Sequence, residues 1–531
     1  MSAIRVLMVA AEAYPLAKTG GLGDAVTGMS MAMGAAGLDV QLLIPAYQGV
    51  IQKLSRARVV AHLPELPGGP ATLLRGRCKT SGLTVLALRN DSLYSRHTGL
   101  YVGEDGKEHA DNALRFAALA HAASRIAQGL PDLERPQVVH AHDWHAALAP
   151  LLMKAAGIKD VASVLTIHNL AFQGLYDMQW ADKIALPQAY RGEDHAQAWG
   201  RINFMKAGII HADRVTTVSH HYAREILTPE FGCGLDPVLA ARGPALMAIA
   251  NGIDSHEWDP SHDPALGAWR YSARDVRPKA HCKAALQKEF GLPVLPDSPI
   301  LAMGSRLTHQ KMADVAVEAL PLALQADPDL QVIAIGRGDA AMEQSLAALA
   351  ERFPGRCAVR IGFDETTAHR LHAGADMLLH GSRFEPFGLT PVYAMRYGTV
   401  PVGSRVGGMV DTIRDAGDQA PDEAMRSATG VLFDGDKATA MAGAIARALR
   451  LYRQKPLWRA MQRNGMTADF GWQQAVLPYA DLFANLAAAL PQPQPAPVEF
   501  AVQPALTRPA AARPAPARQP ATAGGMLPAA A

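Results

Sequence analysis

The sequence predicts an α/β protein built from two doubly wound, largely parallel domains that face a cleft. Three observations indicate this fold. Short apolar runs alternate with helical patterns almost throughout, as in βαβ units. The runs form two successive series, separated by a polar, proline-containing stretch over residues 254–278. The chain has 531 residues, more than one hydrophobic core usually supports. In such sheets ligands bind beyond the carboxyl ends of the strands.

The first apolar run, IRVLMV over residues 4–9, predicts a buried parallel strand that leads into AAEAYPLAKTGGLGD. The glycines and the helical pattern after them predict a strand–loop–helix unit, whose helix start presents unpaired backbone N–H groups. Lys18 adds a point charge suited to phosphate, and Asp24 falls in the first turn of the helix. This stretch alone is compatible with an anion site and also with a plain tight turn beside a surface lysine.

The remaining strands follow the same pattern. The first series continues at residues 40–45, 83–89, 137–143, 162–169 and 214–219 and ends near residue 250. The second series covers residues 299–306, 330–339, 357–363, 376–383 and 399–408. We therefore expect a first domain over 1–252, a hinge over 253–275, a second domain over 276–470 and a closing amphipathic helix over 471–490. Residues 491–531 are rich in Pro and Ala and lack an apolar period, which predicts a disordered tail.

Composition excludes several classes of protein. The net charge is +2 and no basic block stands out, so no nucleic-acid partner is expected. The four cysteines lie far apart, which argues against a disulfide framework and a structural zinc site. The first strand begins almost at the N-terminus, leaving no room for a signal peptide, and the most apolar helix candidate, 112–130, carries charged residues. A cytoplasmic protein without a membrane partner is the expectation.

Cationic side chains and one carboxylate stand where strands of the second series end. Arg306 and Lys311, in SRLTHQK, flank a strand-to-helix turn that repeats the geometry around Lys18. Three cations at strand ends suit a diphosphate, although each alone could be a surface charge. Glu385, in SRFEPFG, precedes a helix expected to start near residues 388–390, so it should stay ionised at neutral pH. The simpler interpretation of Glu385 is an acidic residue that stabilises the start of a helix and has no role in binding or catalysis.

A histidine-rich stretch, HAHDWH over residues 140–145, could suggest a metal site. Strand alternation places His140 and His142 on one face, but a catalytic metal needs a third converging ligand. We favour a strand-end cluster, with Asp143, that faces a polar ligand. His168, in TIHN after the next strand, belongs to the same rim. The DGD triplet over 434–436 is interpreted as a polar turn, so no metal is predicted.

Several motifs of this sequence resemble those of a known family. KTGGLGD, HAHDWH, TIHNLAFQG, NFMKAGI, PEFGCGL, NGID, SRLTHQK, SRFEPFGLTPVYAMRYGTVPVGSRVGGMVDT and TGVLF occur in the order seen in bacterial glycogen synthases and plant starch synthases. DFGWQQAVLPYADLF resembles their closing helix, and the similarity spans roughly residues 3–487. The resemblance implies a glycosyltransferase B fold of two Rossmann-like domains, with the C-terminal helix returning to the first. It also implies retaining transfer of glucose from ADP-glucose to the non-reducing end of an α-1,4-glucan such as glycogen, without a metal or other cofactor.

The resemblance also implies roles for individual residues. Those expected in catalysis are Glu385, His168, Arg306 and Lys311. Those expected to bind substrate are Lys18, Gly21, Asp143, Asn169, Tyr94, Asn251 and Phe363. The cations and Gly21 would hold the ADP-glucose phosphates, and Phe363 would lie beside the adenine. Tyr94 would lie near the donor and acceptor sugars. The transferred glucose would be surrounded by His168, Asn169, Asp143 and Glu385.

Four positions depart from related patterns. Met312 stands where the family usually has glycine, which could alter the loop backbone if that glycine needs a positive φ. His220 replaces a usual proline, and Phe387 replaces a common cysteine. Related transferases carry a second glutamate eight residues after the first, and this chain has Tyr393 there, as the glycogen synthase branch does. Front-face attack, with the leaving phosphate taking the acceptor's proton, is therefore the expected mechanism.

Other functions remain open from the residues alone. A sucrose or trehalose-phosphate synthase would share the fold and differ in its acceptor. A catalytically silent glucan-binding protein would have lost Glu385, Lys18 or Lys311, and all three are present. A phosphorylase-like enzyme would need a lysine-bound pyridoxal cofactor, for which no motif is found. The residues do not choose between ADP and UDP, and oligomeric state and regulation stay open.

Overall fold

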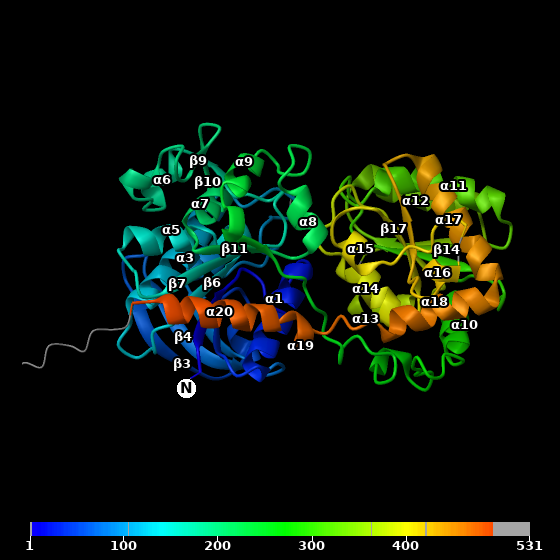
Figure 1. Cartoon of the computed structure of the whole chain (residues 1–531), viewed down its shortest axis with the longest axis horizontal. Helices are drawn as coiled ribbons and strands as arrows, with labels where there is room; N and C mark the ends of the chain where they lie inside the picture. The colour runs from blue at the N-terminus through cyan, green and yellow to red at the C-terminus, as the bar shows by residue number, and fades with distance from the viewer. Residues whose placement is uncertain (1–2, 105, 363, 420–421, 492–531) are drawn as a thin grey trace, which may run out of the picture. The chain divides into compact units, whose positions relative to one another are not determined.

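The computed structural model describes residues 3–104, 106–362, 364–419 and 422–491 (Figure 1). Phe363 lies outside the described residues. The predicted tail does so as well, apart from its first residue, Pro491. Two largely parallel sheets organise the described chain, which confirms the predicted α/β class. No helix in the described ranges is both long and apolar enough to cross a lipid bilayer.

The first sheet has nine strands in the order β12-β11-β7-β6-β1-β2-β5-β4-β3. Its strands are β1 (Arg5–Val9), β2 (Asp39–Pro45), β3 (Leu54–Leu63), β4 (Ala71–Cys78), β5 (Thr84–Arg89), β6 (Val138–His142), β7 (Ala162–Ile167), β11 (Arg214–Thr217) and β12 (Leu246–Ala248). Neighbours from β12 to β5 pair in parallel, with Val6 opposite both Val40 and Val138.

The antiparallel edge formed by β3 and β4 was not predicted. Most of β3 is exposed or half-buried, and it carries Arg56 and Arg58, so it lacks the apolar run that marks the central strands. An edge strand needs only a few inward side chains, and charges there discourage pairing with other molecules. The same lobe holds a small antiparallel sheet, β8-β10-β9, from β8 (Leu175–Asp177), β9 (Gln197–Ala198) and β10 (Arg201–Asn203).

Helices surround this sheet. They are α1 (Gly21–Ala35), α2 (Asp91–Tyr94), α3 (Asn112–Gln128), α4 (Asp143–Ala146), α5 (Leu148–Ala155), α6 (Trp180–Lys183), α7 (Phe204–His211), α8 (His220–Glu225) and α9 (Asp236–Ala240). Short 3₁₀ turns cover Ile51–Lys53, Gln188–Tyr190 and Gly243–Ala245. The apolar stretch predicted over 112–130 is α3, which is mostly buried in the core of this lobe.

The second sheet has six parallel strands in the order β15-β14-β13-β16-β17-β18. They are β13 (Ile300–Gly304), β14 (Gln331–Gly336), β15 (Cys357–Ile361), β16 (Met377–His380), β17 (Val400–Ser404) and β18 (Val431–Phe433). The accompanying helices are α10 (Lys279–Glu289), α11 (Ala313–Ala326), α12 (Ala340–Arg352), α13 (Glu365–Gly374), α14 (Leu389–Arg396), α15 (Gly407–Thr412), α16 (Asp422–Met425), α17 (Ala438–Arg453) and α18 (Lys455–Thr467). Every strand of the second predicted series is present.

The segment between the sheets, predicted as a hinge over 253–275, packs onto helices of the second lobe. It contains one short 3₁₀ turn, Pro264–Leu266. The Trp258 ring stacks on Tyr393 of α14, with ring centres 3.8 Å apart, and on His369 of α13 at 4.1 Å. These contacts fix the segment although it has little regular structure of its own.

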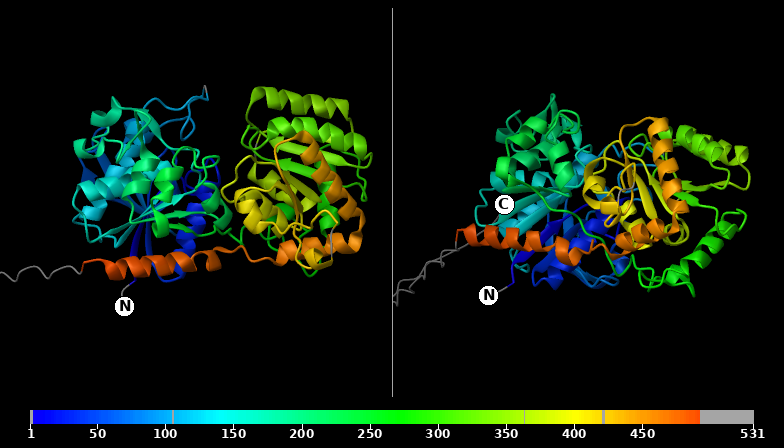
Figure 2. Two further views of the ribbon diagram at one scale, coloured as in Figure 1. Left: turned by 45° about the horizontal axis from the view of Figure 1, so that its top comes forward. Right: turned by 45° about the vertical axis from the view of Figure 1, so that its right-hand side comes forward.

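The C-terminal helix lies against the first lobe. The predicted single helix over 471–490 is two helices, α19 (Trp472–Ala475) and α20 (Leu477–Ala489), because Pro478 at the start of α20 cannot continue the preceding turn. Tyr479 and Phe483 of α20 are buried in the core of the first sheet. Both views in Figure 2 show α20, in orange-red, running beside the blue strands of that lobe. The predicted return of this helix is confirmed.

Candidate active site

A buried ion pair lies at the carboxyl ends of two strands in the second lobe. Lys311, in the loop after β13, pairs through Nζ with Oε2 of Glu385, in the loop after β16. His380, the last residue of β16, places Nε2 at 2.9 Å from the same oxygen. Glu385 is 7% exposed. Burial alone would raise the pKa of Glu385, but Lys311 and His380 outweigh it and lower the pKa to about 2.

Glu385 is therefore ionised at neutral pH, as predicted, but for a different reason. The sequence suggested the start of a helix as the stabilising charge, whereas the structure shows two side chains on the carboxylate. His380 was missed. Its signal was a histidine at the end of a strand, five residues before the glutamate.

The backbone of the Glu385 loop is held by two glycines at the start of α15. The N–H of Gly408 donates to the carbonyl oxygen of Glu385 at 2.9 Å. Gly407 has a φ of +48°, and a Cβ built on it would lie 1.8 Å from that same oxygen. A side chain at this position is excluded both by backbone strain and by direct contact.

Lys18 lies in the turn before α1 and is half-buried. Its Nζ is 2.9 Å from Asp24 in the first turn of α1 and 3.4 Å from Glu365, the first residue of α13. Burial would lower the pKa of Lys18, but Asp24 and Glu365 outweigh it and raise the pKa. The ammonium is thus charged and already paired. Gly21 is the exposed first residue of α1.

Glu12, just beyond the end of β1, organises this turn and was missed by the sequence analysis. Its buried carboxylate accepts hydrogen bonds from Thr19 N at 2.7 Å, Thr19 Oγ1 at 2.7 Å, Gly20 N at 3.2 Å and the hydroxyl of Tyr101 at 2.6 Å. Its only sequence signal was a single acid in the apolar stretch AAEAY. Because Glu12 occupies the N–H groups of Thr19 and Gly20, an anion at this helix start would use those from Gly21 onward.

A second polar group joins the ends of β6 and β7 in the first lobe. Nδ1 of His142 lies 2.9 Å from Nε2 of His168. Oδ1 of Asp143 accepts the backbone N–H groups of His168 at 2.7 Å and of Asn169 at 3.2 Å. Burial lowers the pKa of His168 to about 3, so its ring is neutral at pH 7. Burial also raises the pKa of Asp143 to about 7, against the effect of the two N–H donors. The predicted rim of His168, Asp143 and Asn169 is thus assembled.

His140 does not belong to this rim. It is fully buried, its Nε2 lies 2.6 Å from Oγ1 of Thr166, and its ring centre lies 5.3 Å from that of Tyr479 in α20. The expectation that His140 faces a ligand with His142 is therefore wrong, because α20 covers its side of the sheet. Within the described residues, no group of three or more His, Cys, Asp and Glu side chains is arranged to hold a metal ion.

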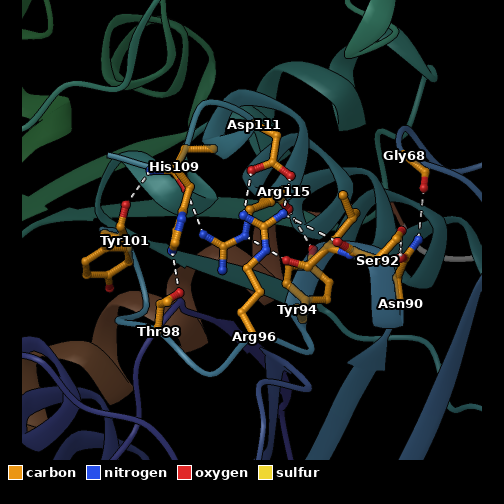
Figure 3. Close-up of polar contacts among 12 residues, drawn as sticks. Gly68, Asn90, Ser92, Tyr94, Arg96, Thr98, Tyr101, His109, Asp111 and Arg115 are labelled. Carbon is orange, nitrogen blue, oxygen red and sulfur yellow. Dashed lines mark hydrogen bonds and ion pairs between the residues drawn. The ribbon is translucent and has the colours of Figure 1, made fainter. Parts of the chain in front are cut away.

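Tyr94 ends α2 and lines a hollow of about 290 Å³ in the first lobe. Figure 3 shows the polar contacts around Tyr94. Its hydroxyl donates to the carbonyl oxygen of Arg115 at 2.6 Å, which fixes the ring. Arg96 and Thr98, in the loop that follows α2, line the same hollow. The structure thus places Tyr94 in a polar concavity, while its role near sugars stays a prediction.

Two of the remaining predicted residues, Arg306 and Asn251, form few side-chain hydrogen bonds. Arg306 is exposed, with its guanidinium 3.4 Å from Oε1 of Gln310. Asn251 is 8% exposed, and its Oδ1 has no hydrogen-bond partner within the described residues. Arg306 thus presents its guanidinium at the surface, whereas the unpaired oxygen of Asn251 is buried. The predicted adenine partner, Phe363, lies outside the described residues.

Met312 occupies the position where the resemblance implies glycine. Its φ of +51° and ψ of 34° place it in the left-handed region, at the N-cap of α11. The backbone therefore does need a positive φ here, and methionine adopts it with a buried side chain beside Ser404. The strand-to-helix turn around Lys311 therefore contains a methionine in a left-handed conformation.

The chain is similar to known proteins over most of its length. A family model described as starch synthase catalytic domain matches residues 5–241, and one described as glycosyl transferases group 1 matches residues 287–466. The chain is 60% identical over 499 residues to a glycogen synthase of Bordetella petrii, covering 93% of this chain and 96% of the relative. It is 52% identical to a glycogen synthase of Ralstonia nicotianae, covering 93% and 90%. The solved catalytic domain of starch synthase IV from Arabidopsis thaliana, bound to ADP and acarbose, superposes with a TM-score of 0.82 at 26% identity, covering 92% of this chain and all of that one.

Proposed function

Since this chain belongs to the family of glycogen and starch synthases, we propose that it transfers glucose from ADP-glucose to the non-reducing end of an α-1,4-glucan, with retention of configuration. The observation that carries the proposal is the buried Lys311–Glu385–His380 group, because it places a cation and a carboxylate together at the carboxyl ends of parallel strands. ADP as the nucleotide is supported by the starch synthase neighbour, which was solved with ADP bound.

The leaving diphosphate needs positive charge as the anomeric bond breaks. Lys311 and Arg306, on one strand-to-helix turn, would supply positive charge from the second lobe, and Lys18 from the first. A unit charge at about 4 Å contributes roughly 4 kcal/mol at an effective dielectric near 20, so a few such cations can do the work that a divalent metal does elsewhere. Lys18 would exchange Glu365 for a phosphate oxygen, because its ammonium is already paired.

The carboxylate of Glu385 would face the positive charge that develops on the sugar. A double displacement needs a nucleophile of its own beside the anomeric carbon. Related transferases carry a second glutamate eight residues after the first, and Tyr393, which stands there in this chain, is buried with its ring on Trp258. We therefore favour front-face attack, in which an oxygen of the leaving phosphate takes the proton of the acceptor hydroxyl. His168, neutral at pH 7, would serve as a hydrogen-bond partner of the sugar rather than as a charge.

The direct test is glucose transfer from ADP-glucose and UDP-glucose to glycogen, with fructose 6-phosphate and glucose 6-phosphate as alternative acceptors. We expect transfer to glycogen with a preference for ADP-glucose, undiminished by EDTA. Transfer to a sugar phosphate would indicate a sucrose-phosphate or trehalose-phosphate synthase activity. Binding of glycogen without any transfer would support the silent glucan-binding alternative.

Lys18→Gln should weaken donor binding and leave the fold intact. Losing a hydrogen bond from a charged group to phosphate costs about 1.5–3 kcal/mol, which corresponds to roughly a ten- to hundredfold rise in KM for ADP-glucose. Lys18→Arg should recover only part of the loss, because a planar guanidinium does not replace a compact ammonium between Asp24 and Glu365. The measurement is steady-state kinetics with varied ADP-glucose at saturating glycogen. Wild-type donor kinetics in Lys18→Gln would show that Lys18 is only a surface charge.

A further inference from the structure

Trp199 adopts a backbone conformation that disfavours a large side chain. It forms, with Gly200, the two-residue turn between β9 and β10, where Ala198 pairs with Arg201. The φ angles of Trp199 and Gly200 are +52° and +73°. Two positive φ angles mark a type I′ hairpin turn, for which Asn-Gly is the favoured pair. A tryptophan strains this turn, so the turn itself does not explain the residue.

Burial does not explain Trp199 either. The residue is 58% exposed, the most exposed large apolar residue among those described. The six-membered edge of its ring rests on Gly234, since a Cβ built on Gly234 would lie 2.6 Å from Cζ2. Single exposed apolar residues are common, but one that also strains the backbone points to a ligand.

A buried glutamine connects Trp199 to the candidate active site. Gln173 lies in the loop that carries His168 and Asn169. Its Nε2 donates to the carbonyl oxygen of Cys233, next to Gly234, at 3.0 Å, and its Oε1 accepts from Nδ2 of Asn203 in β10 at 2.6 Å. The Trp199 hairpin, the Gly234 turn and the His168 loop are therefore held together.

We propose that Trp199 is a stacking platform for the α-1,4-glucan acceptor, for sugar units beyond the one that reacts; this inference rests on the proposed function. The C–H groups on one face of a pyranose carry partial positive charge and pack on the negative face of an aromatic ring. A glucan is uncharged, so an exposed indole suits it better than a cation would. Phe172, 49% exposed and adjacent to Gln173, is a second aromatic side chain on the same loop.

Trp199→Asn tests the platform because it removes the ring and supplies the residue that the turn prefers. We expect an unchanged or higher melting temperature, and a KM for glycogen raised about three- to tenfold. The kcat and the KM for ADP-glucose should change less than about twofold, because the chemistry of donor cleavage does not involve the ring. Migration in native gels containing glycogen should be less retarded than that of the wild type, independently of activity.

Two variants control this experiment. Trp199→Phe should restore most of the glycogen affinity. Trp269, in the segment between the sheets, is another exposed tryptophan; it is 45% exposed and stacks on His281 of α10. Trp269→Asn should leave glycogen kinetics unchanged. If Trp199→Asn kept the wild-type KM for glycogen and the wild-type retardation in the gel, the inference would be overturned. It would also be overturned if light scattering showed that the wild type is a dimer and the variant is not, because the ring would then be a contact between two copies of the chain. If the wild type transferred no glucose, the proposed function would fail, and the gel would still decide whether Trp199 binds glucan.

Discussion

Glu385→Gln is expected to lower kcat by roughly 10²–10³, as removal of one preorganised electrostatic group does in other enzymes. The side chain keeps its shape but loses the charge that would face the developing sugar cation. The KM for ADP-glucose should change much less, because this loss is felt mainly in the transition state. The measurement is steady-state kinetics together with thermal melts.

The same variant has a pH signature. The folded-state pKa of Glu385 is about 2, below its ordinary value of 4.5, so its ion pair stabilises the fold above pH 4.5. That contribution is lost as pH falls from 4.5 toward 2. The difference in melting temperature between wild type and Glu385→Gln should therefore be constant above pH 5 and shrink below it. If kcat falls as the pH is lowered through the neutral range, a group other than Glu385 must be responsible.

A matched control separates catalysis from stability. Glu289 accepts hydrogen bonds from Arg370 at 2.8 Å and Arg360 at 3.0 Å in the same lobe. Glu289→Gln should lower the melting temperature and keep kcat near wild type. Equal kcat values for wild type and Glu385→Gln would exclude a charge role for Glu385.

Gly407→Ala is expected to reduce kcat at least about a hundredfold, because the new Cβ would lie 1.8 Å from the carbonyl oxygen of Glu385. Relieving that contact requires the Glu385 loop to move by more than an ångström, which separates the carboxylate from Lys311 or His380. Solution of the variant's crystal structure would show the displacement, and kinetics would show the loss.

Gly435→Ala is the control for Gly407→Ala. Gly435 also has a positive φ, +79°, in the turn after β18, but an added Cβ meets nothing within 4 Å. It should show only the strain of a left-handed alanine, about 1–2 kcal/mol of stability, and retain activity. A similar loss of kcat in both variants would show that strain, not the contact with Glu385, is responsible.

Much of the fold could be predicted because its signals are local. The central strands are buried on both faces, so each appears as an apolar run, and helix patterns lie between them. The edge strand β3 could not be recognised, because exposed edge positions accept charged residues. The division of the last helix was visible only as Pro478, whose effect on an otherwise continuous apolar pattern was overlooked.

The candidate site, like the fold, contains residues that local sequence signals indicate and residues that they do not. Lys18, Lys311, Glu385 and His168 could be selected as candidates because they follow strand ends, where polar residues interrupt apolar runs. Glu12 and His380 were missed because each acts on residues brought to it by the fold: Glu12 reaches Tyr101, and His380 shares an oxygen of Glu385 with Lys311. His140 was misplaced because strand alternation gives its face but not what covers it.

By itself the sequence determined the α/β class, the two series of strands and the chemical types of residue at the strand ends, since these depend on periodicity and local order. Only the tertiary structure decided how those residues are paired. It shows that Lys311 neutralises Glu385, that Glu12 occupies two N–H groups of the Lys18 turn, and that burial leaves His168 neutral. Charge, hydrogen bonding and pKa are set by neighbours within a few ångströms, and residues far apart along the chain become such neighbours only when it folds.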